Sequence, residues 1–198
     1  MILSDREIQD ALKRGKIRID PEPQEEQYTT SALDLLFGDE MYEHQTAEEV
    51  QAQEPKGVRR PLIVDPSDID LNAVLEKYAK PFPPEKDGSF LFPPGKFALA
   101  VTREKVELFR SSKIAARVEG RSTLARLGLA VHITAPTIHA GFSGRIVLEM
   151  YNFGQYHLRL SPGKLAICQL IFERLGRIPR GPVRTTHQGQ MGVIKKRR

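Results

Sequence analysis

A glutamate stands within a largely apolar stretch at residues 145–151, which read RIVLEMY. The alternation predicts a β-strand whose two faces separate Leu148 from Glu149. Glu149 then lies between Val147 and Tyr151 on one face, where partial burial would disfavour its charged form and raise its pKa. That property suits a group that accepts and returns a proton. The alternative is a face open to water, with Glu149 paired with a nearby arginine.

A second candidate site lies about one strand earlier, at the start of an expected short helix. Ser122 directly precedes the helix-like run 123–127, which Gly128 closes. A serine at this place can cap the first free backbone N–H groups, and the remaining N–H groups with the helix dipole can bind phosphate. Arg121 and Arg126 flank the run, and guanidinium groups suit phosphate oxygens. The alternative is an ordinary capped helix with two solvated arginines.

Composition and charge fit one domain over residues 1–198. The chain is 40% hydrophobic and carries a net charge of +5, which favours an anionic partner. Much of the excess comes from the last four residues, within a basic tail at 193–198 that we expect to be mobile. Nucleic acid is the weaker interpretation, because the chain lacks Trp and has no basic stretch interleaved with aromatic residues.

The sequence indicates a cytoplasmic protein. Apolar runs are too short to cross a bilayer, and the charged start MILSDREIQD does not resemble a signal peptide. The single cysteine, Cys168, excludes an internal disulfide and is expected to be a small buried apolar residue.

The order of expected elements predicts a mainly β fold with an N-terminal helix and one or two further short helices. A capping box at Ser4 and Glu7 starts the first helix, and Gly15 should end it. Short strands are expected at regular spacing, which is typical of a barrel or sandwich. Their ranges are 17–19, 32–37, 62–64, 97–102, 106–109, 114–118, 130–134, 145–151, 157–160 and 165–172.

The connections between these strands carry their own signals. Gly38 and Asp39 should end the strand at 32–37, and the polar stretch 43–60 is expected to form a long loop or flap. A helix with an apolar stripe at 71–78, capped by Ser67 or Asp68, is expected to pack rather than to take part in chemistry. The segment PPGKFA at 93–98 is echoed by SPGKLA at 161–166, which predicts two equivalent corners of one β-structure.

Several of these segments together resemble the dCTP deaminase branch of the dUTPase-like trimeric nucleotide enzymes. The match begins with RSTLARLGL at 121–129, followed by HITAPTIHAGFSGRIVLE at 132–149. It extends to MILSDREI at 1–8, SALDLLFG at 31–38 and GQMG at 189–192. The resemblance covers most of the chain in order. It implies a dUTPase-like distorted β-barrel and a homotrimer with sites shared between subunits.

The resemblance also implies a role for each matching residue. Glu149 resembles the catalytic proton carrier, Ser122 a hydroxyl that orients water and base, and Arg126 a stabiliser of charge near the reacting ring. Arg121 and Gln190 resemble contacts to the triphosphate, and Phe142 an aromatic that packs on the sugar. The remaining positions implied in substrate binding are Thr123, Ile133, Ala135, His139, Val147 and Leu148.

Two positions depart from the family pattern. His139 stands where the family has an aspartate that contacts the sugar 3′-hydroxyl in the deaminases and orients the attacking water in the dUTPases. This change argues against efficient hydrolysis of dUTP. Near the C-terminus the family often has Lys-Tyr before Gln-Gly-Gln, whereas residues 186–187 here are Thr-His, so a phosphate-contacting tyrosine is missing.

The expected activity is hydrolytic deamination of dCTP to dUTP and ammonia. Zinc is not expected, because the chain has neither a His-x-Glu nor a Pro-Cys-x-x-Cys segment. Mg²⁺ is expected to arrive with the triphosphate and to be held by phosphate oxygens. The alternatives are an enzyme that also cleaves the triphosphate to give dUMP and pyrophosphate, and a nucleotide-binding regulator that has lost turnover.

Overall fold

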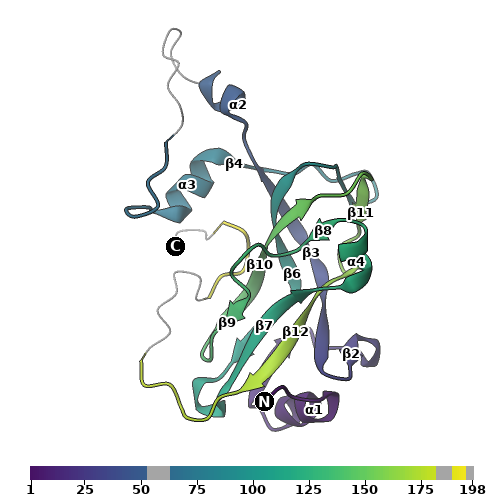
Figure 1. Ribbon diagram of the computed structural model, residues 1–198, viewed down its shortest axis with the longest axis vertical. Helices are drawn as coiled ribbons and strands as arrows, with labels where there is room; N and C mark the ends of the chain where they lie inside the picture. The colour runs from purple at the N-terminus through teal and green to yellow at the C-terminus, as the bar shows by residue number, and fades with distance from the viewer. Residues whose placement is uncertain (53–62, 182–188, 195–198) are drawn as a thin grey trace.

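A computed structural model describes residues 1–52, 63–181 and 189–194, and it shows a mainly β structure (Figure 1). A ten-stranded antiparallel sheet has the path β8-β10-β6-β3-β12-β7-β9, with β1, β2 and β4 paired off this path, and β11 pairs with β5 separately. The strands are β1 (Ile17–Asp20), β2 (Tyr28–Thr29), β3 (Ala32–His44), β4 (Ala79–Pro81), β5 (Phe90–Phe92), β6 (Phe97–Leu108), β7 (Ile114–Gly120), β8 (Leu129–Ala130), β9 (Thr137–Ile138), β10 (Ser143–Asn152), β11 (Leu158–Leu160) and β12 (Ala166–Arg174).

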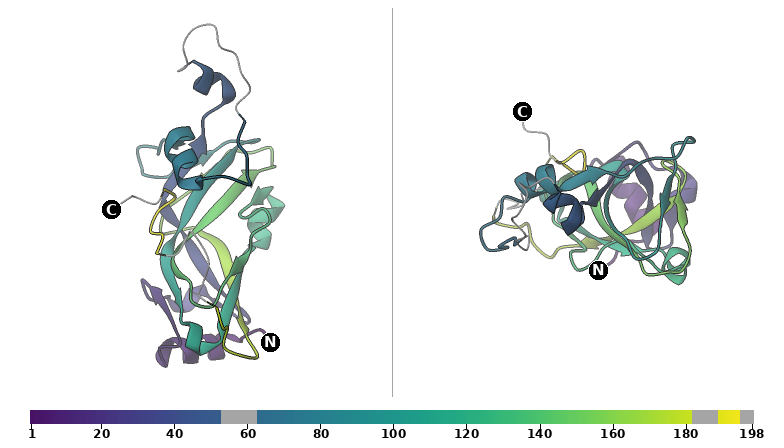
Figure 2. Two further views of the ribbon diagram at one scale, coloured as in Figure 1. Left: turned by 90° about the vertical axis from the view of Figure 1, so that its left-hand side faces the viewer. Right: turned by 90° about the horizontal axis from the view of Figure 1, so that it is seen from above.

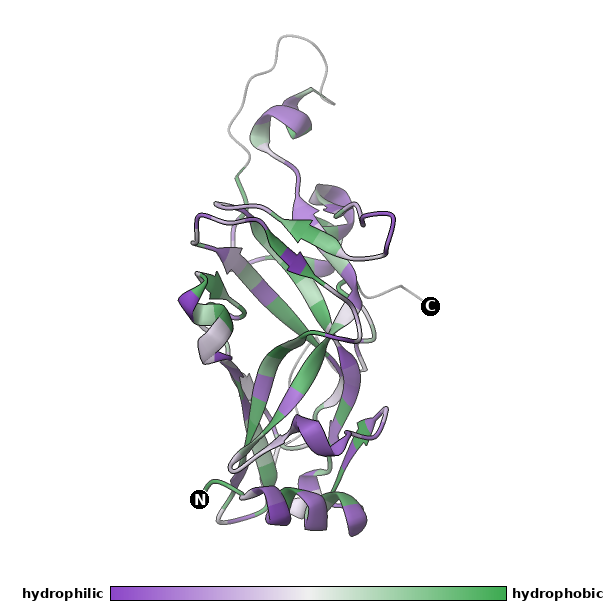
Figure 3. Cartoon of the chain, turned by 90° about the vertical axis from the view of Figure 1, so that its right-hand side faces the viewer, coloured by the Kyte–Doolittle hydropathy of each residue, from purple (hydrophilic) through white to green (hydrophobic). Residues whose placement is uncertain are grey.

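The sheet curls around a common interior, as the view along the long axis shows (Figure 2). Apolar and polar positions alternate along its strands (Figure 3), so that one face of each strand supplies the core. Phe37, Phe92 and Phe172 are among the largest fully buried side chains there. The predicted mainly β class is confirmed, and the predicted distorted barrel takes the form of a curled, half-barrel sheet.

The helices are α1 (Asp5–Lys13), α2 (Ala47–Gln51), α3 (Leu71–Tyr78) and α4 (Ser122–Arg126), with 3₁₀ turns η1 (Glu25–Gln27) and η2 (Arg110–Ser112). The capping box of α1 forms as predicted, and Gly15 follows the helix in the left-handed region with φ 61°. Three α-helices therefore follow α1 in the described residues, in place of the one or two predicted.

Strand β3 corrects the prediction that Gly38 and Asp39 end it. The strand continues to His44, and its pairing with β6 shifts register between Phe37 and Met41. A Cβ on Gly38 would clash with the guanidinium of Arg145 and would lie 2.6 Å from the Val101 carbonyl oxygen. The glycine therefore allows close packing inside a strand and does not mark a turn.

Other strand boundaries also differ from the predictions. β6 is one continuous strand, although two were expected within 97–109. β8 ends at Ala130, so the residues after 130 form a loop in place of the strand expected to 134. Ile63 and Val64 lie in irregular structure, and the third residue of that expected strand, Leu62, is outside the described residues.

The expected flap at 43–60 is largely regular where the structure describes it. β3 runs to residue 44, and Thr46 and Glu49 form a capping box that begins α2. The same motif that predicts α1 therefore also begins α2, inside the stretch expected to form a loop. Residues 53–62 lie outside the described part. Helix α3 carries the expected apolar stripe but begins later than predicted, because its N-cap is Asp70 and not Ser67 or Asp68.

The two echoed Pro-Gly segments do form equivalent corners. Gly95 and Gly163 both adopt left-handed conformations, with φ 70° and 68°. Each lies shortly before a long strand, β6 and β12 respectively. Because only glycine enters this region readily, the repeated residue type has a direct conformational reason.

A small second apolar cluster lies apart from the main core. Leu99 and Val101 of β6 meet Leu75 of α3 and Val193 of the C-terminal segment. Val193 is 1% exposed, and Ile194 packs against the same cluster. Two residues of the predicted tail thus pack in this cluster, and residues 195–198 lie outside the described part. The cluster fixes α3 and the C-terminal segment over the outer face of β6 and β10.

Gly128 offers a test of how α4 is held in place. It follows α4 with φ 91°, and a Cβ there would lie 2.5 Å from the Gly154 Cα. Gly15 has φ 61° but open space around it. Gly15→Ala should cost about 1 kcal/mol of unfolding free energy from backbone strain, and Gly128→Ala should cost roughly 2 kcal/mol more. Denaturant unfolding of both variants measures this difference, and equal losses would contradict the tight contact.

Candidate functional site

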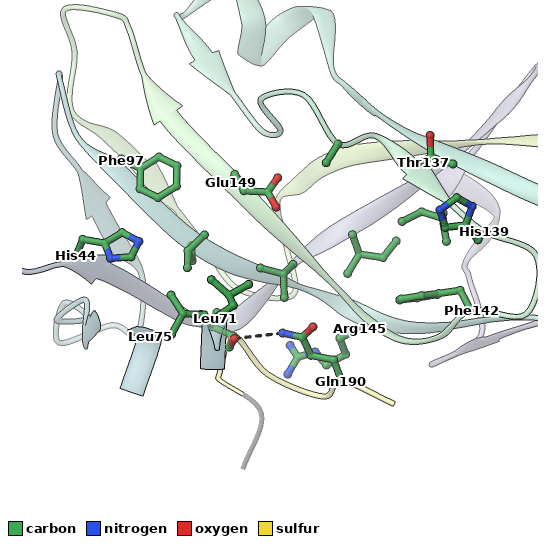
Figure 4. A pocket seen from close by; sticks show the side chains of 16 residues that line it. His44, Leu71, Leu75, Phe97, Thr137, His139, Phe142, Arg145, Glu149 and Gln190 are labelled. Carbon is green, nitrogen blue, oxygen red and sulfur yellow. Dashed lines mark hydrogen bonds between the residues drawn. The ribbon is translucent and has the colours of Figure 1, made fainter. Parts of the chain in front are cut away.

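A cavity of about 460 Å³ opens on the outer face of β10 and β6 (Figure 4). Helix α3, β9 with the loop after it, and the C-terminal segment enclose it. The cavity brings together half of the predicted site residues. Those that line it are Ala135, His139, Phe142, Val147, Glu149 and Gln190.

Glu149 reaches the cavity because of the register of β10. Burial alternates along this strand as the sequence predicted, with Leu148 fully buried and Glu149 half-buried on the opposite face. Glu149 lies opposite Leu99 of β6, and its carboxylate points into the cavity (Figure 4). Leu148 itself faces the main core, so only its backbone is available on the cavity side. The expected rise in the pKa of Glu149 stays a prediction.

One end of the cavity is apolar and was not predicted as part of a site. Leu71 and Leu75 of α3 line it together with Phe97. His44 stacks on Phe97 with ring centroids 5.7 Å apart, and burial lowers the pKa of His44, which favours its neutral form. The helix at 71–78, expected to serve packing alone, therefore also lines the cavity. Its apolar stripe was visible in the sequence, but nothing local showed which surface it covers.

The other end carries polar groups. Arg145 and Gln190 line it beside His139 and Phe142 (Figure 4). The Gln190 side chain is 6% exposed, and its amide nitrogen donates hydrogen bonds to the carbonyl oxygens of Gly192 and Val193 at 2.8 and 3.1 Å. Gln190 thus lies at the cavity while part of its amide is bonded within its own segment.

His139 separates this cavity from another one. A second cavity, of about 660 Å³, lies beside β7, β9 and β12 and is lined by Arg117 and Glu173 among others. His139 and Thr137 line both cavities. The histidine that replaces the family's aspartate therefore lies in the wall between the two cavities.

The residues on and beside α4 do not line the main cavity within this chain. The cavity lining does not include Arg121, Ser122, Thr123 or Arg126. Helix α4, with Arg121 as its N-cap, lies on the opposite side of the sheet from α3 and the C-terminal segment (Figure 1), and Ile133 is 56% exposed on the loop after β8. Ser122 is the first helical residue and not the N-cap. The N-cap is Arg121, and its side chain makes no capping bond. The predicted serine cap is therefore wrong, because the helix begins one residue earlier than expected.

Comparisons with known proteins address the family directly. A family model described as dCTP deaminase-like matches residues 2–175. The chain belongs to the dCTP deaminase-like family. The dUMP-forming dCTP deaminase of Methanosphaera stadtmanae is 41% identical over 174 residues, which cover 88% of this chain and 79% of that protein. The dCTP deaminase of Tolumonas auensis is 35% identical over 204 residues, which cover 100% and 98%.

A solved structure supports the fold of this family member. The dCTP deaminase of Agrobacterium tumefaciens matches with a TM-score of 0.54 and 18% identity, over 88% of this chain and 48% of that one. This chain therefore spans about half the length of that structure. Within the described residues, no helix is long and apolar enough to cross a membrane.

Sequence reasoning missed one carboxylate that the structure ties to the α4 segment. Asp34 of β3 is 4% exposed and forms an ion pair with Arg121, while its other oxygen, Oδ1, has no hydrogen-bond partner among the residues that the structure describes. Burial raises the pKa of Asp34, and Arg121 acts in the opposite direction. The available signal was an aspartate inside the apolar run SALDLLFG. Arg121, predicted to contact phosphate, is thus held through a buried partner.

The Asp34–Arg121 pair predicts a pH-dependent loss of stability. Arg121→Met should lower the unfolding free energy by about 1–3 kcal/mol at neutral pH, because it leaves Asp34 without its cation. A raised folded-state pKa means that the native state binds the proton more readily than the unfolded chain. The deficit should therefore be smallest in acid. It should grow as the pH rises from the folded-state pKa of Asp34 in the wild type to its higher folded-state pKa in Arg121→Met, which lacks the cation that lowers it. Denaturant unfolding across this range measures it.

The double variant Arg121→Met with Asp34→Asn serves as the control for this prediction. It leaves no charge to bury, so it should recover most of the lost stability at neutral pH and show no such pH dependence. A deficit of Arg121→Met that is constant with pH would contradict the assigned role of Asp34.

Proposed function

We propose that this protein catalyses the hydrolytic deamination of dCTP, in which dCTP and water give dUTP and ammonia. The observation that carries the proposal is Glu149, a carboxylate that points into a largely apolar cavity lined by other residues of the family pattern. The names of the curated relatives support the substrate.

Glu149 supplies the proton transfers in this mechanism. Water attacks C4 of the cytosine while Glu149 accepts one of its protons. Glu149 passes this first proton to ring nitrogen N3. It then accepts the proton of the new C4 hydroxyl and gives it to the amino group, so that the C4–N4 bond breaks, the C4 carbonyl forms and ammonia departs. One positioned carboxyl group can serve both steps, first as general base and then as general acid.

The walls of the cavity select the substrate. Backbone groups of Val147, Leu148 and Ala135 hold the pyrimidine, with Ile133 contributing from the preceding loop, and Phe142 packs on the sugar. His139 lies where it can meet the sugar, and Gln190 lies towards the phosphates. Mg²⁺ enters bound to the triphosphate. The phosphate oxygens of the nucleotide are its ligands, and the ion offsets the phosphate charge.

The groups on α4 complete the site from a second copy of the chain. Ser122, Thr123 and Arg126 are exposed, together with Leu127 and Phe153, which are 41% and 69% exposed. Exposed apolar residues beside exposed functional groups are typical of an interface. In the proposed homotrimer, Ser122 orients the water, Arg126 stabilises charge that develops on the ring, and Arg121 and Thr123 lie beside the phosphates.

Formation of dUMP is the second candidate. Relatives named dUMP-forming dCTP deaminase are 37–41% identical to this chain. His139 at the position of the family's aspartate weighs against it, because that aspartate orients the water in dUTP hydrolysis. The departure at residues 186–187 lies outside the described part. Release of pyrophosphate distinguishes the two reactions.

Replacement of Glu149 tests the chemistry. Glu149→Gln should lower kcat about 10²–10⁴-fold, since positioned acid–base catalysis has this magnitude, while dCTP binding should change by only a few fold. Chromatography of the products from dCTP, CTP and dUTP, with Mg²⁺ present, measures turnover. Glu26→Gln, on an exposed turn remote from the cavity, is the control. Ammonia release at the wild-type rate by Glu149→Gln would contradict the mechanism. Tight binding without turnover in the wild type would favour a regulator.

Mixing two inactive variants tests the shared site. If Glu149 and Arg126 act in one site from different copies, a co-refolded mixture of Glu149→Gln and Arg126→Met should contain intact sites. For random mixing in a cyclic trimer, about a quarter of the sites should be intact, and activity should return to that level. Each variant refolded alone is the control. A mixture as inactive as its components would show that a site needs both residues from one chain.

A further inference from the structure

Arg145 makes an unusual set of contacts for a residue at the start of a strand. Its side chain is 13% exposed and lies where β10, β6, β3 and the C-terminal segment 189–194 meet. Nε donates to the Thr102 carbonyl oxygen at 2.6 Å, and Nη2 donates to Asp39 Oδ1 at 2.7 Å. Nη1 donates to the Met191 carbonyl oxygen at 3.4 Å. The guanidinium therefore ties two core strands to a segment far away in the sequence.

The backbone around Arg145 holds the same segment. The Arg145 N–H donates to the Gln190 carbonyl oxygen at 2.8 Å, and the Gly189 N–H donates to the Ser143 carbonyl oxygen at 2.7 Å. A Cβ on Gly144 would lie 2.6 Å from that same Gln190 oxygen, so glycine is required for this approach. The start of β10 is thus shaped to receive residues 189–191.

A second contact holds the far end of the segment. The Val193 N–H donates to Glu40 Oε2 at 3.3 Å, and a Cβ on Gly192 would lie 2.5 Å from this oxygen. The Val193 side chain is 1% exposed within the cluster formed with Leu75 and Leu99. Segment 189–194 is therefore fixed at both ends, and Gln190 and Val193 form part of the cavity wall.

We propose that Arg145 is a positioning residue, whose guanidinium holds segment 189–194 against the cavity and thereby sets the affinity for the triphosphate end of the substrate. The inference rests on the proposed function for its substrate, but the seating of the segment is independent of it. The family resemblance implies the triphosphate contact of Gln190 but assigns no role to Arg145, and the family model matches residues 2–175. Arg145 acts through Gln190 and not on the reacting carbon.

Arg145 also forms an ion pair with Asp39, at an exposed position. Asp39 is 76% exposed, and its hydrogen bond with Arg145 lowers the pKa of Asp39, so the carboxylate stays charged at neutral pH. Exposure and screening make such a pair weak. The contacts to Thr102 and Met191 should therefore dominate, and Asp39→Asn should leave the segment seated.

Hydrogen–deuterium exchange of the full-length protein without nucleotide tests the seating directly. In Arg145→Met, exchange of the amides in 189–194 should speed up about tenfold or more, because the segment loses its contact to the guanidinium. Arg145→Lys keeps the charge but cannot make all three hydrogen bonds. Its exchange rate in 189–194 should therefore fall between those of the wild type and Arg145→Met. Arg103→Met, which removes the same charge from neighbouring β6, is the matched control and should leave this exchange unchanged. Unchanged exchange in Arg145→Met would overturn the proposal whatever the enzyme activity.

Kinetics then test the consequence for the substrate. Arg145→Met should raise KM for dCTP about tenfold and leave kcat within about twofold, as expected for a contact that does not strengthen in the transition state. Val193→Asp unseats the segment from its other end while Arg145 keeps its bonds to β6 and β3, and it should raise KM similarly. Adding Arg145→Met to Val193→Asp should then change KM no further.

The outcomes distinguish the two proposals. If the KM increases of Arg145→Met and Val193→Asp multiply in the double variant, Arg145 contacts the nucleotide itself or supports the sheet, and the positioning role is wrong. An equal loss of kcat and of kcat/KM in Arg145→Met would also overturn it. If no variant or wild type deaminates dCTP but exchange behaves as expected, the proposed function fails while the positioning of the segment stands.

Discussion

The antiparallel pairing of β10 with β6 decides which side chains of β10 face the cavity. Glu149 lies opposite Leu99, and the pairing shifts register between Arg145 and Val147. Because side chains alternate with a period of two, a slip of one residue would bring Leu148 to the cavity and bury the carboxylate in the main core. The apolar neighbours of Glu149 on β10 stabilise the observed register by about 25 cal/mol per Å² of apolar area that they bury. This stabilisation opposes any such slip. The position of the carboxylate thus follows from the packing of its apolar neighbours.

The cover of the cavity depends on contacts between segments far apart in the chain. Helix α3 and segment 189–194 meet on the outer face of β6 through Leu75 and Val193. Neither segment has a large core of its own, so each relies on the other and on the sheet. The contact between Leu75 and Val193 therefore holds the apolar end of the cavity, on α3, and the polar end, at Gln190, on the same sheet face.

Local sequence patterns predicted the elements whose causes are local. The alternation in β10 gave the face of Glu149, the capping box gave α1, and the Pro-Gly corners before β6 and β12 were correct. Gly38 does not end its strand as predicted. A glycine is needed there because the guanidinium of Arg145, more than a hundred residues away in the sequence, packs against it. The Asp34–Arg121 pair and the apolar wall from α3 were missed for the same reason. The separation of α4 from Glu149 within one chain could not be predicted from spacing, since it depends on the whole path of the sheet.

Cytosine should bind beside Glu149, in the cavity on the outer face of β10. The most direct measurement is a crystal structure of Glu149→Gln with dCTP bound. We predict that C4 of the cytosine lies beside residue 149, with the sugar against Phe142 and an α4 segment from a neighbouring copy next to the ring. Nucleotide bound elsewhere, such as in the cavity beside β7 and β12 that Arg117 lines, would contradict the account.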